Sequence, residues 1–257
     1  MRRGLTASRQ RALEAIEGGR VLVDGLPARS AARRIAPEEP VTISGDGPRF
    51  VSRGGEKLVA ALAEFEIDPT GRRALDAGAS TGGFTDCLLQ SGAAHVVAAD
   101  VGRGQLVWSL RTDPRVTVLE RTNVRHLEAD AIGGPVDLCT ADLSFISLSA
   151  CAPAFARCTI AGADLVLLVK PQFEAGRRDV GKGGVVRDAS IHRAVLRRVR
   201  DGLAAAGIHA VRAMPSPLRG ADGNVEFFLR ARKDAAPTLG DDALDAAVDR
   251  AHTGALS

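Results

Sequence analysis

Short apolar segments alternate with stretches of helical spacing along residues 73–233. The apolar segments predict seven strands, at Ala74–Ala77, Val96–Asp100, Val116–Glu120, Val136–Ala141, Leu165–Lys170, Ala210–Ala213 and Val225–Ala231. Helical stretches separate the first six strands, which predicts an α/β fold with a doubly wound, mostly parallel sheet. The loop at 216–224 is too short for the crossover that joins parallel neighbours, so we expect the last strand to run antiparallel.

The first fifty residues follow a different pattern. Apolar residues at helical spacing begin after Ser8, a favourable N-cap, and end at Gly18-Gly19. Apolar segments at Val21–Val23 and Val41–Ile43 predict short strands, and Asp24-Gly25 is typical of a tight turn. These residues therefore predict a small α+β module made of one helix and a hairpin.

Changes in this pattern divide the chain into four parts. The N-terminal module covers residues 1–50, and the break around Ser52-Arg53-Gly54-Gly55 predicts a linker at 51–56. The α/β domain then covers residues 57–233. Residues 234–257 form a C-terminal tail, in which one short helix is expected at Leu239–Ala251.

The composition excludes several classes of protein. The 257 residues are 45% apolar and 25% charged, which is enough to bury the core of one large domain with a small appendage. The four cysteines show neither a Cys-x-x-Cys pair nor zinc-ligand spacing, and the five histidines form no ligand cluster, so no disulfide scaffold or metal is expected. Because no apolar signal segment or membrane-spanning run is present, we expect a soluble cytoplasmic protein.

Positive charge is concentrated in two parts of the chain, although the net charge is only +3. Residues 1–53 carry 10 arginines and 6 acidic residues (+4), and residues 170–200 carry 9 basic and 3 acidic residues (+6). The remainder of the chain therefore carries −7. Two basic segments on an acidic remainder favour a polyanionic partner over solvated surface alone.

A glycine-rich segment at 76–83 follows the first predicted strand, where open α/β sheets bind nucleotides. Asp76 precedes its first glycine and Ser80 replaces the usual second one, so the segment resembles the first motif of S-adenosylmethionine (SAM) methyltransferases, in which an acid faces a cationic ligand. Asp100 follows Gly78 by 22 residues, where a carboxylate can bind both hydroxyls of a ribose. A glycine turn kept for packing and a helix N-cap at Asp100 are the structural alternatives.

The fourth and fifth strands lead into Asp142 and Lys170, which are expected in the crevice beside the cofactor's methyl group. Asp142-Leu143-Ser144-Phe145 is also similar to the Asn/Asp-Pro-Pro-Tyr/Phe tetrad of base N-methyltransferases. Both prolines are absent here, so base methylation is the second hypothesis. Phe145 and Phe173 flank the predicted site and either belong to the core or stack on a displaced base.

Longer motifs carry a resemblance to a known family. They are Asp76-Ala-Gly-Ala-Ser-Thr-Gly-Gly-Phe-Thr85, Ala99-Asp-Val-Gly102, Ala141-Asp-Leu-Ser-Phe-Ile-Ser147, Val169-Lys-Pro-Gln-Phe-Glu174 and Gly223-Asn-Val-Glu-Phe227. Together they resemble the TlyA family, often named hemolysin A. The resemblance implies a Rossmann-like, class I SAM-dependent methyltransferase of FtsJ-like type that modifies the ribose 2′-hydroxyl of cytidines in 16S and 23S rRNA within ribosomal subunits.

The resemblance also implies functional residues. The family's Lys-Asp-Lys-Glu catalytic tetrad corresponds to Lys57, Asp142, Lys170 and Glu226. The cofactor-binding residues implied are Asp76, Gly78, Ala79, Ser80, Thr81, Gly82, Gly83, Phe84, Asp100, Val101 and Asp142. The basic residues expected to contact RNA phosphates are Arg9, Arg11, Arg20, Arg177, Arg178, Lys182 and Arg187.

The N-terminal module resembles an αL-type RNA-binding module through the segments at 4–12 and 19–25. Family chains carry an Arg-Leu-Asp segment ahead of the position of Gly4-Leu5, so we expect a shortened module here. Two other classes of function compete with the enzyme. A membrane-active hemolysin would need an apolar hairpin or a strongly amphipathic helix, and neither is evident. A ribosome-binding factor without catalysis is disfavoured by the complete tetrad.

Overall fold

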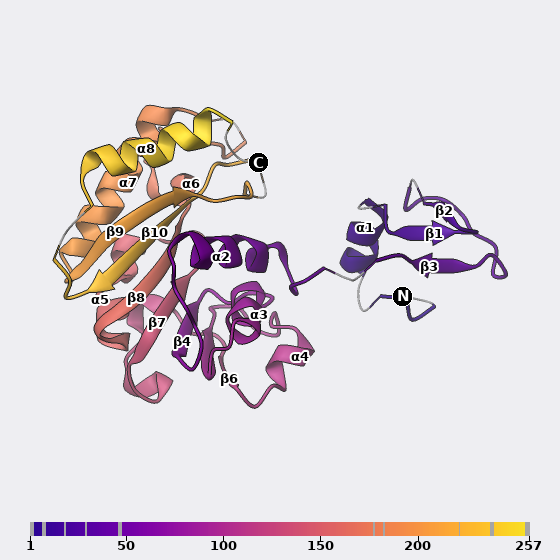
Figure 1. Cartoon of the computed structure of the whole chain (residues 1–257), viewed down its shortest axis with the longest axis horizontal. Helices are drawn as coiled ribbons and strands as arrows, with labels where there is room; N and C mark the ends of the chain where they lie inside the picture. The colour runs from indigo at the N-terminus through magenta and orange to yellow at the C-terminus, as the bar shows by residue number, and fades with distance from the viewer. Residues whose placement is uncertain are drawn as a thin grey trace. The chain divides into compact units, whose positions relative to one another are not determined.

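The computed structural model describes residues 3–6, 9–17, 19–28, 30–45, 48–176, 178–181, 183–220, 222–236 and 239–254. The chain divides into two compact units, Met1–Arg49 and Phe50–Ser257 (Figure 1). The predicted module ended one residue later, at Phe50. That residue is buried in the core of the second unit, where the Phe50 ring occupies the space that a side chain at Gly55 would need.

In the first unit, helix α1 (Arg9–Glu17) precedes a small antiparallel sheet in the order β2-β1-β3. Its strands are β1 (Val21–Val23), β2 (Leu26–Pro27) and β3 (Val41–Ile43). Asp24 and Gly25 both have positive φ, which matches the twist of a two-residue hairpin turn. Ala15 of α1 packs on the sheet in a core of its own, so the predicted helix and hairpin are present; the predicted N-cap Ser8 lies outside the described residues.

Seven strands form the sheet of the second unit, in the order β6-β5-β4-β7-β8-β10-β9. They are β4 (Arg73–Ala77), β5 (His95–Ala99), β6 (Val116–Leu119), β7 (Val136–Ala141), β8 (Thr159–Val169), β9 (Ile208–Pro215) and β10 (Phe227–Lys233). The strands from β6 to β8 pair in parallel, and β10 runs antiparallel to both β8 and β9. The predicted mostly parallel sheet with an antiparallel last strand is confirmed.

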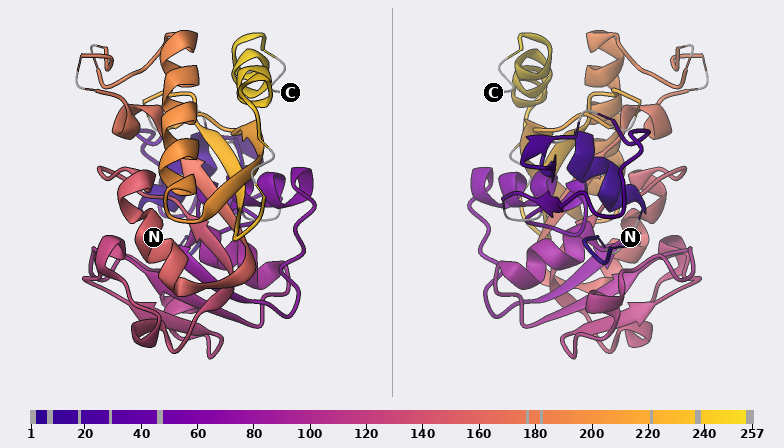
Figure 2. Two further views of the ribbon diagram at one scale, coloured as in Figure 1. Left: turned by 90° about the vertical axis from the view of Figure 1, so that its left-hand side faces the viewer. Right: turned by 90° about the vertical axis from the view of Figure 1, so that its right-hand side faces the viewer.

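Two hydrophobic cores lie on the two faces of this sheet. Successive strand residues point to opposite faces, and Ala74 and Leu75 accordingly belong to different cores. One face is covered by α2 (Arg53–Glu64), α3 (Gly83–Gln90) and α4 (Trp108–Arg111). The other is covered by α5 (Leu148–Cys158), α7 (Ala189–Ala204) and α8 (Asp241–His252), and the short α6 (Pro171–Glu174) precedes α7 (Figure 2).

The helix predicted between the third and fourth strands is replaced by two single 3₁₀ turns, η1 (Val124–His126) and η2 (Asp130–Ile132). The side chain of Asn123 accepts a hydrogen bond from the Arg125 N–H, which satisfies the backbone without a continuing helix. Gly133 and Gly134 then adopt positive φ and end the segment. The polar residue and the glycine pair therefore outweigh the weak helical spacing here.

The predicted linker and tail also differ from the structure. Residues 53–56 are the first turn of α2, and the Ser52 hydroxyl caps this helix by accepting the Gly54 N–H (3.3 Å). The helix expected in the tail is present as α8, but it is part of the domain, because Leu244 and Val248 are buried in the core beneath it. The second unit thus extends from Phe50 through α8.

Candidate active site

The carboxyl ends of the central strands meet at one edge of the sheet. Ala77, the last residue of β4, pairs with Ala99 of β5 and Ala141 of β7. The chain continues from these three strand ends into the glycine-rich loop, Asp100 and Asp142. Parallel strands therefore bring together polar residues that are far apart in the sequence.

The antiparallel strand β10 adds a fourth polar residue to the same edge. Val169 at the end of β8 pairs with Phe227 at the start of β10. Lys170 therefore follows, and Glu226 precedes, the same pair of residues. An antiparallel last strand is what allows a residue near the C-terminus to enter at the edge where the parallel strands end.

The glycine-rich loop approaches the neighbouring strand closely. A Cβ at Gly78, which has φ +88°, would lie 2.5 Å from the Asp142 carbonyl oxygen. Ser80 also adopts positive φ (48°), a conformation more usual for glycine, and its N–H donates to Asp100 Oδ2 (2.8 Å). Asp100 thus stabilises the loop at the position where the dinucleotide fingerprint would have a glycine.

A cavity of about 660 Å³ lies between this loop, Asp100 and the residues after β6 and β7. Its lining includes the predicted residues Gly78, Ser80, Asp100, Val101 and Asp142. A further part of the lining was not predicted to bind the cofactor. It is formed by Gln105, Thr122, Asn123, Val124, Arg125, Leu143, Ser144 and Ile146. The position of 122–125 just after the third strand was a signal that could have found four of these eight residues.

Asp100 is held in place by backbone amides on both oxygens. Besides the Ser80 N–H, the Gly102 N–H donates to Asp100 Oδ1 (2.6 Å). The alternative that Asp100 is a helix N-cap is wrong, because α4 begins only at Trp108. Since each carboxylate oxygen can accept more than one hydrogen bond, the oriented carboxylate keeps capacity for ligand hydroxyls at the cavity wall.

Two of the predicted cofactor residues do not reach a cavity in the described part of the chain. Asp76 is fully buried and accepts a hydrogen bond from the Thr85 hydroxyl (2.6 Å). It lines neither this cavity nor the adjoining second cavity described below. The prediction that Asp76 faces a ligand is therefore corrected. Burial raises the pKa of Asp76 to about 7. A side chain at Gly82 would overlap Leu110, so this glycine serves close packing.

A second cavity, of about 300 Å³, adjoins the first and shares Gly78, Ser80, Asp142 and Ser144 with it. Of the predicted cofactor residues it is lined by Ala79, Thr81, Gly83 and Phe84 as well. All four members of the predicted tetrad, Lys57, Asp142, Lys170 and Glu226, line it too. The structure therefore brings together residues from α2, from the ends of β7 and β8, and from the start of β10.

The tetrad is arranged as two ion pairs. Lys57 Nζ donates to Glu226 Oε2 at 2.5 Å, and both side chains are largely buried. Lys170 Nζ lies 2.5 Å from Asp142 Oδ1 as an ion pair without hydrogen-bond alignment, and it donates to the Ser144 hydroxyl (3.2 Å). The Lys170 pair is the more exposed of the two, chiefly because 24% of the Asp142 side chain is accessible.

Two arginines that the sequence analysis did not select also line the second cavity. Arg53 Nη2 donates to the Arg219 carbonyl (2.8 Å), and Arg219 Nη1 donates to the Gly223 carbonyl (3.3 Å). Within the described residues, neither guanidinium group forms an ion pair with a carboxylate. Uncompensated cations at the cavity that contains the tetrad make this region attractive to an anion.

An aromatic pair lies beside Lys170. The Phe145 ring is 89% exposed, packs on Phe173 with ring centroids 4.8 Å apart, and belongs to a residue with positive φ (63°). Lys170 Nζ is 5.8 Å from the Phe173 ring centroid. The alternative that both rings are core residues is therefore wrong for Phe145.

A buried carboxylate supports the loop that carries Phe145. Glu174 Oε1 accepts a hydrogen bond from the Leu148 N–H (2.7 Å) at the start of α5. Burial raises the pKa of Glu174, and the Leu148 N–H opposes that shift. The contact joins the segment after β7 to the segment after β8, on the two sides of the Lys170 pair.

The predicted RNA-contacting residues are only partly within the described structure. Arg9, Arg178 and Arg187 are exposed and Arg20 is half-buried. Arg177, Lys182 and the side chain of Arg11 lie outside the described residues. The described candidates occur on both units, Arg9 and Arg20 on the first and Arg178 and Arg187 on the second.

Much of the charge of the second basic segment is compensated by the C-terminal helix. Arg193, Arg197 and Arg200 of α7 form ion pairs with Asp241, Asp245 and Asp249 of α8. The +6 counted along residues 170–200 therefore overstates the positive potential of the folded surface. The available cations are concentrated before α7, where Arg178 and Arg187 are exposed.

Two negative findings concern the described residues. None of their helices combines the length and the apolar character needed to cross a bilayer. Their histidine, cysteine, aspartate and glutamate side chains form no group of three or more that could hold a metal ion.

Known proteins with similar sequences are named as methyltransferases or as hemolysins. The sequence matches the FtsJ-like methyltransferase family over residues 50–233. A Mycobacterium tuberculosis protein named 16S/23S rRNA (cytidine-2′-O)-methyltransferase TlyA is 54% identical over 256 residues, covering 98% of this chain and 94% of that protein. Hemolysin A of Brachyspira hyodysenteriae is 39% identical over 226 residues, covering 88% of this chain and 94% of that protein.

A solved structure from Streptococcus thermophilus, whose name calls it a hemolysin, superimposes with a TM-score of 0.81 at 39% identity, covering 98% of this chain and 93% of that one. This chain is thus similar both to proteins with hemolysin names and to a protein named as an rRNA methyltransferase. This chain is a member of the TlyA family of FtsJ-like methyltransferases.

Proposed function

We propose that this protein is a cytoplasmic SAM-dependent methyltransferase that modifies the ribose 2′-hydroxyl of cytidine in rRNA of the ribosomal subunits. The observation that carries the proposal is the meeting of the Lys57–Glu226 and Lys170–Asp142 pairs in one cavity beside the cavity that ends at Asp100. The name of the Mycobacterium tuberculosis relative supports cytidine 2′-O-methylation as the reaction.

The larger cavity fits the nucleoside part of SAM. Its volume of about 660 Å³ lies within the usual range for small-molecule sites, and Asp100 offers a carboxylate to ribose hydroxyls. Asn123 and Val124 also line this cavity, and we propose that they contact the adenine. The smaller cavity begins at Gly78 and Ser80, which both cavities share. When bound, SAM supplies an electrophilic methyl group on a sulfonium sulfur.

The tetrad then acts on the acceptor nucleotide. Lys170 is proposed to hold the 2′-oxygen in line for methyl transfer and to take up its proton when it reacts as the free amine. Asp142 and Ser144 orient the Lys170 amino group, as their contacts with Nζ indicate. Lys57 and Glu226 form the opposite wall, where the Lys57 ammonium is fixed by its buried partner.

The surrounding residues fit a displaced cytidine. The exposed Phe145 ring, backed by Phe173, offers a face for stacking a base that has left its helix. Arg53 and Arg219 line the same cavity, and we propose that they contact backbone phosphates next to the acceptor ribose. Base N-methylation remains the second hypothesis, and it is disfavoured because Asp142 is engaged with Lys170 instead of being free for a base amino group.

The proposal is tested by incubating isolated small and large ribosomal subunits with the protein and labelled SAM, and then mapping the modified nucleotide. We expect 2′-O-methylcytidine in 16S or 23S rRNA. A methyl group on the cytosine amino nitrogen would revive the base-methylation hypothesis. The absence of any transfer to either subunit would contradict the proposed reaction.

Substituting Asp100 tests the placement of the nucleoside. Asp100→Ala removes the acceptor of the proposed ribose hydrogen bonds and of the Ser80 and Gly102 N–H groups. We expect SAM affinity to fall by about 1.5–3 kcal/mol, measured by calorimetry on protein shown to be folded. Asp130→Ala, which removes an exposed carboxylate from η2, is the control and should bind as the unaltered protein does. Unchanged affinity in Asp100→Ala would place the ribose elsewhere.

Removal of the N-terminal unit tests its proposed role as an RNA anchor. The deletion should cover residues 1–48, because Phe50 is part of the second unit's core and the Val51 N–H donates to Asp86. We expect SAM binding to be retained, and subunit binding to weaken with a shallower dependence on salt, since fewer arginines reach phosphates. Equal affinity and an equal salt slope in filter-binding assays would show that the unit does not anchor RNA.

A further inference from the structure

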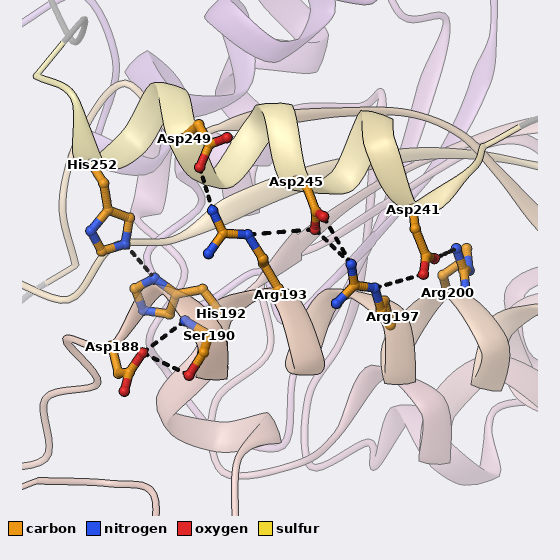
Figure 3. A network of polar contacts seen from close by, with 10 residues as sticks. All are labelled: Asp188, Ser190, His192, Arg193, Arg197, Arg200, Asp241, Asp245, Asp249 and His252. Atoms are coloured by element: carbon orange, nitrogen blue, oxygen red, sulfur yellow. Dashed lines mark hydrogen bonds and ion pairs between the residues drawn. The ribbon is translucent and has the colours of Figure 1, made fainter.

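The end of the C-terminal helix contacts a buried histidine of α7 (Figure 3). His252 Nε2 lies 2.9 Å from His192 Nδ1, and the two ring centroids are 5.1 Å apart. His192 is fully buried, and its hydrogen bonds within the described residues go to His252 and the Val186 carbonyl instead of to the proposed catalytic tetrad. An apolar side chain would fill the same space in the core, so the presence of a buried polar ring here needs an explanation.

The second ring nitrogen of His192 binds the loop that precedes α7. His192 Nε2 is 3.1 Å from the Val186 carbonyl oxygen. A carbonyl oxygen only accepts hydrogen bonds, so Nε2 carries the proton and Nδ1 of the neutral ring accepts from His252 Nε2–H. His192 therefore links the end of α8 to a loop whose next residue is the exposed Arg187.

Val186 in turn is tied to the segment that carries Glu226. The Val186 N–H donates to Asn224 Oδ1 (3.0 Å), and Asn224 Nδ2 donates to the Gly184 carbonyl (3.0 Å). Asn224 is buried and lies two residues before Glu226. The ring of Phe227, on the other side of Glu226, packs edge-on against His192 at 5.4 Å between centroids.

We propose that His192 is a positioning residue for the tetrad: supported by His252, it fixes the 184–187 loop and the Asn224–Phe227 segment, and thereby holds Glu226 against Lys57. This inference rests on the proposed function for its effect on methyl transfer. The contacts themselves are independent of that function. His192 has no direct role in the chemistry, because it acts only through Val186 and Phe227.

The pair of imidazoles makes this support sensitive to pH. The hydrogen bond between His192 Nδ1 and His252 Nε2 needs one proton, carried by either nitrogen. The neutral pair and the singly protonated pair of imidazoles therefore both keep this hydrogen bond. When both rings are protonated, two N–H groups lie opposite each other and the hydrogen bond between the rings is lost. The charged groups that face His192 are His252, Asp188 and Arg219, from α8, the N-cap of α7 and the loop before β10.

Burial lowers the pKa of His192 below its ordinary value of 6.5, and the Val186 carbonyl opposes that shift. The folded protein therefore binds fewer protons at this site than the unfolded chain does. Stability from this site is present above pH 6.5 and is lost as the pH falls through the lower folded pKa. We accordingly expect the support to weaken on the acidic side of pH 6.5.

The half-buried ion pairs between the same two helices provide a matched control. Asp245 Oδ1 accepts a hydrogen bond from Arg197 Nη2 (2.8 Å) and lies 3.5 Å from Arg193 Nε. These contacts belong to a row of ion pairs between α7 and α8 (Figure 3). The Arg197 and Asp245 side chains each keep 34% of their surface exposed, so this pair should contribute less to stability than a fully buried pair would. Asp245→Asn therefore perturbs the contact between the helices without altering either imidazole.

Two substitutions at His192 separate its two contacts. Gln can place an amide N–H near the position of Nε2 and keep the bond to the Val186 carbonyl, whereas Asn can place an acceptor near Nδ1 and keep only the contact with His252. In His192→Gln we expect the Val186 amide to stay protected from hydrogen exchange and the single-turnover rate to stay within about threefold of the unaltered protein. In His192→Asn we expect the Val186 amide to exchange about tenfold faster and the rate to fall by up to roughly 10²-fold.

The pH profile separates positioning from a general loss of stability. As the pH falls below 6.5, Val186 protection and the rate should decline together in the unaltered protein and in Asp245→Asn, and His192→Gln should remove this decline. SAM affinity should stay constant in all variants, since His192 lies outside the larger cavity. Equal rates and equal Val186 protection in His192→Asn and the unaltered protein would overturn the proposal. A decline with falling pH that is as large in His192→Gln as in the unaltered protein would also overturn the proposal.

Failure of the proposed function has a different signature. If the unaltered protein transfers no methyl group to ribosomal subunits, the function is wrong, and the exchange of the Val186 amide still decides whether His192 holds the loop. If transfer occurs and Val186 protection does not depend on His192, only the positioning role is wrong.

Discussion

Replacing Lys170 with methionine is expected to leave the fold and SAM affinity nearly unchanged while methyl transfer falls by at least about 10²-fold. Methionine keeps most of the length of the side chain and removes the amino group that we place against the 2′-oxygen. The fold should tolerate the change, because the partner Asp142 is partly exposed and can be solvated. Lys170→Arg should fail almost as badly, since a planar guanidinium stays protonated and does not reproduce the geometry of an amine.

Single-turnover methyl transfer at saturating enzyme is the measurement that tests this, because it separates the chemical step from weakened binding. Ser144→Ala is the matched control: it removes the hydrogen bond from Lys170 Nζ and leaves the amino group and its carboxylate partner. The control should lose much less activity than Lys170→Met. Near-normal turnover in Lys170→Met would move the chemistry away from this residue.

Replacing Lys57 with methionine is expected to lower the free energy of unfolding by about 3–5 kcal/mol, the usual cost of removing one partner of a buried ion pair. Glu226 is only 3% exposed, so without Lys57 its carboxylate would remain buried and unpaired. The double variant Lys57→Met/Glu226→Gln removes the uncompensated charge and should recover much of the loss. Both variants should be inactive, so the comparison concerns stability alone.

Urea denaturation at neutral pH measures these differences. Arg115→Met is the control, because it breaks a surface pair with Asp113 and should cost no more than about 1 kcal/mol. A loss in Lys57→Met as small as in this control would show that Glu226 finds water or another partner. Failure of the double variant to recover stability would assign the loss to packing of the Lys57 side chain.

The strands and the residues at their ends were predictable from local sequence. Buried strands require short apolar segments, and parallel strands in an open sheet direct the residues after them to one edge. Asp100, Asp142 and Lys170 were found in this way, and all three line the cavities of the candidate active site. The antiparallel last strand followed from the length of one loop.

The interpretation of single residues in the first motif was less reliable. Asp76 was expected to face a ligand, but it lies beneath the loop and is bonded to Thr85. Ser80 departs from the glycine pattern, yet it adopts the conformation of a glycine because Asp100 binds its N–H. Spacing identifies where such a loop lies, and contacts with other segments decide which way each side chain points.

Only the tertiary structure decided which charges are available. The arginines of α7 were counted toward a basic surface, whereas acidic residues of α8, more than forty positions later, compensate several of them. Lys57 could be selected only by family resemblance, because its partner Glu226 is 169 residues away. Arg53 and Arg219 could not be selected from the sequence either, because the segments that they join are also far apart along the chain.

The sequence by itself therefore determined the succession of the seven strands along the chain, the edge of the sheet at which the candidate active site lies, and Asp100, Asp142 and Lys170 as residues at the ends of those strands. These properties depend on local periodicity and chain connectivity, which neighbouring residues encode. Pairing of charges, burial of Asp76 and the link from His252 through His192 to Val186 depend on contacts between distant segments. Such contacts exist only after both cores have packed, so the tertiary structure alone decided them.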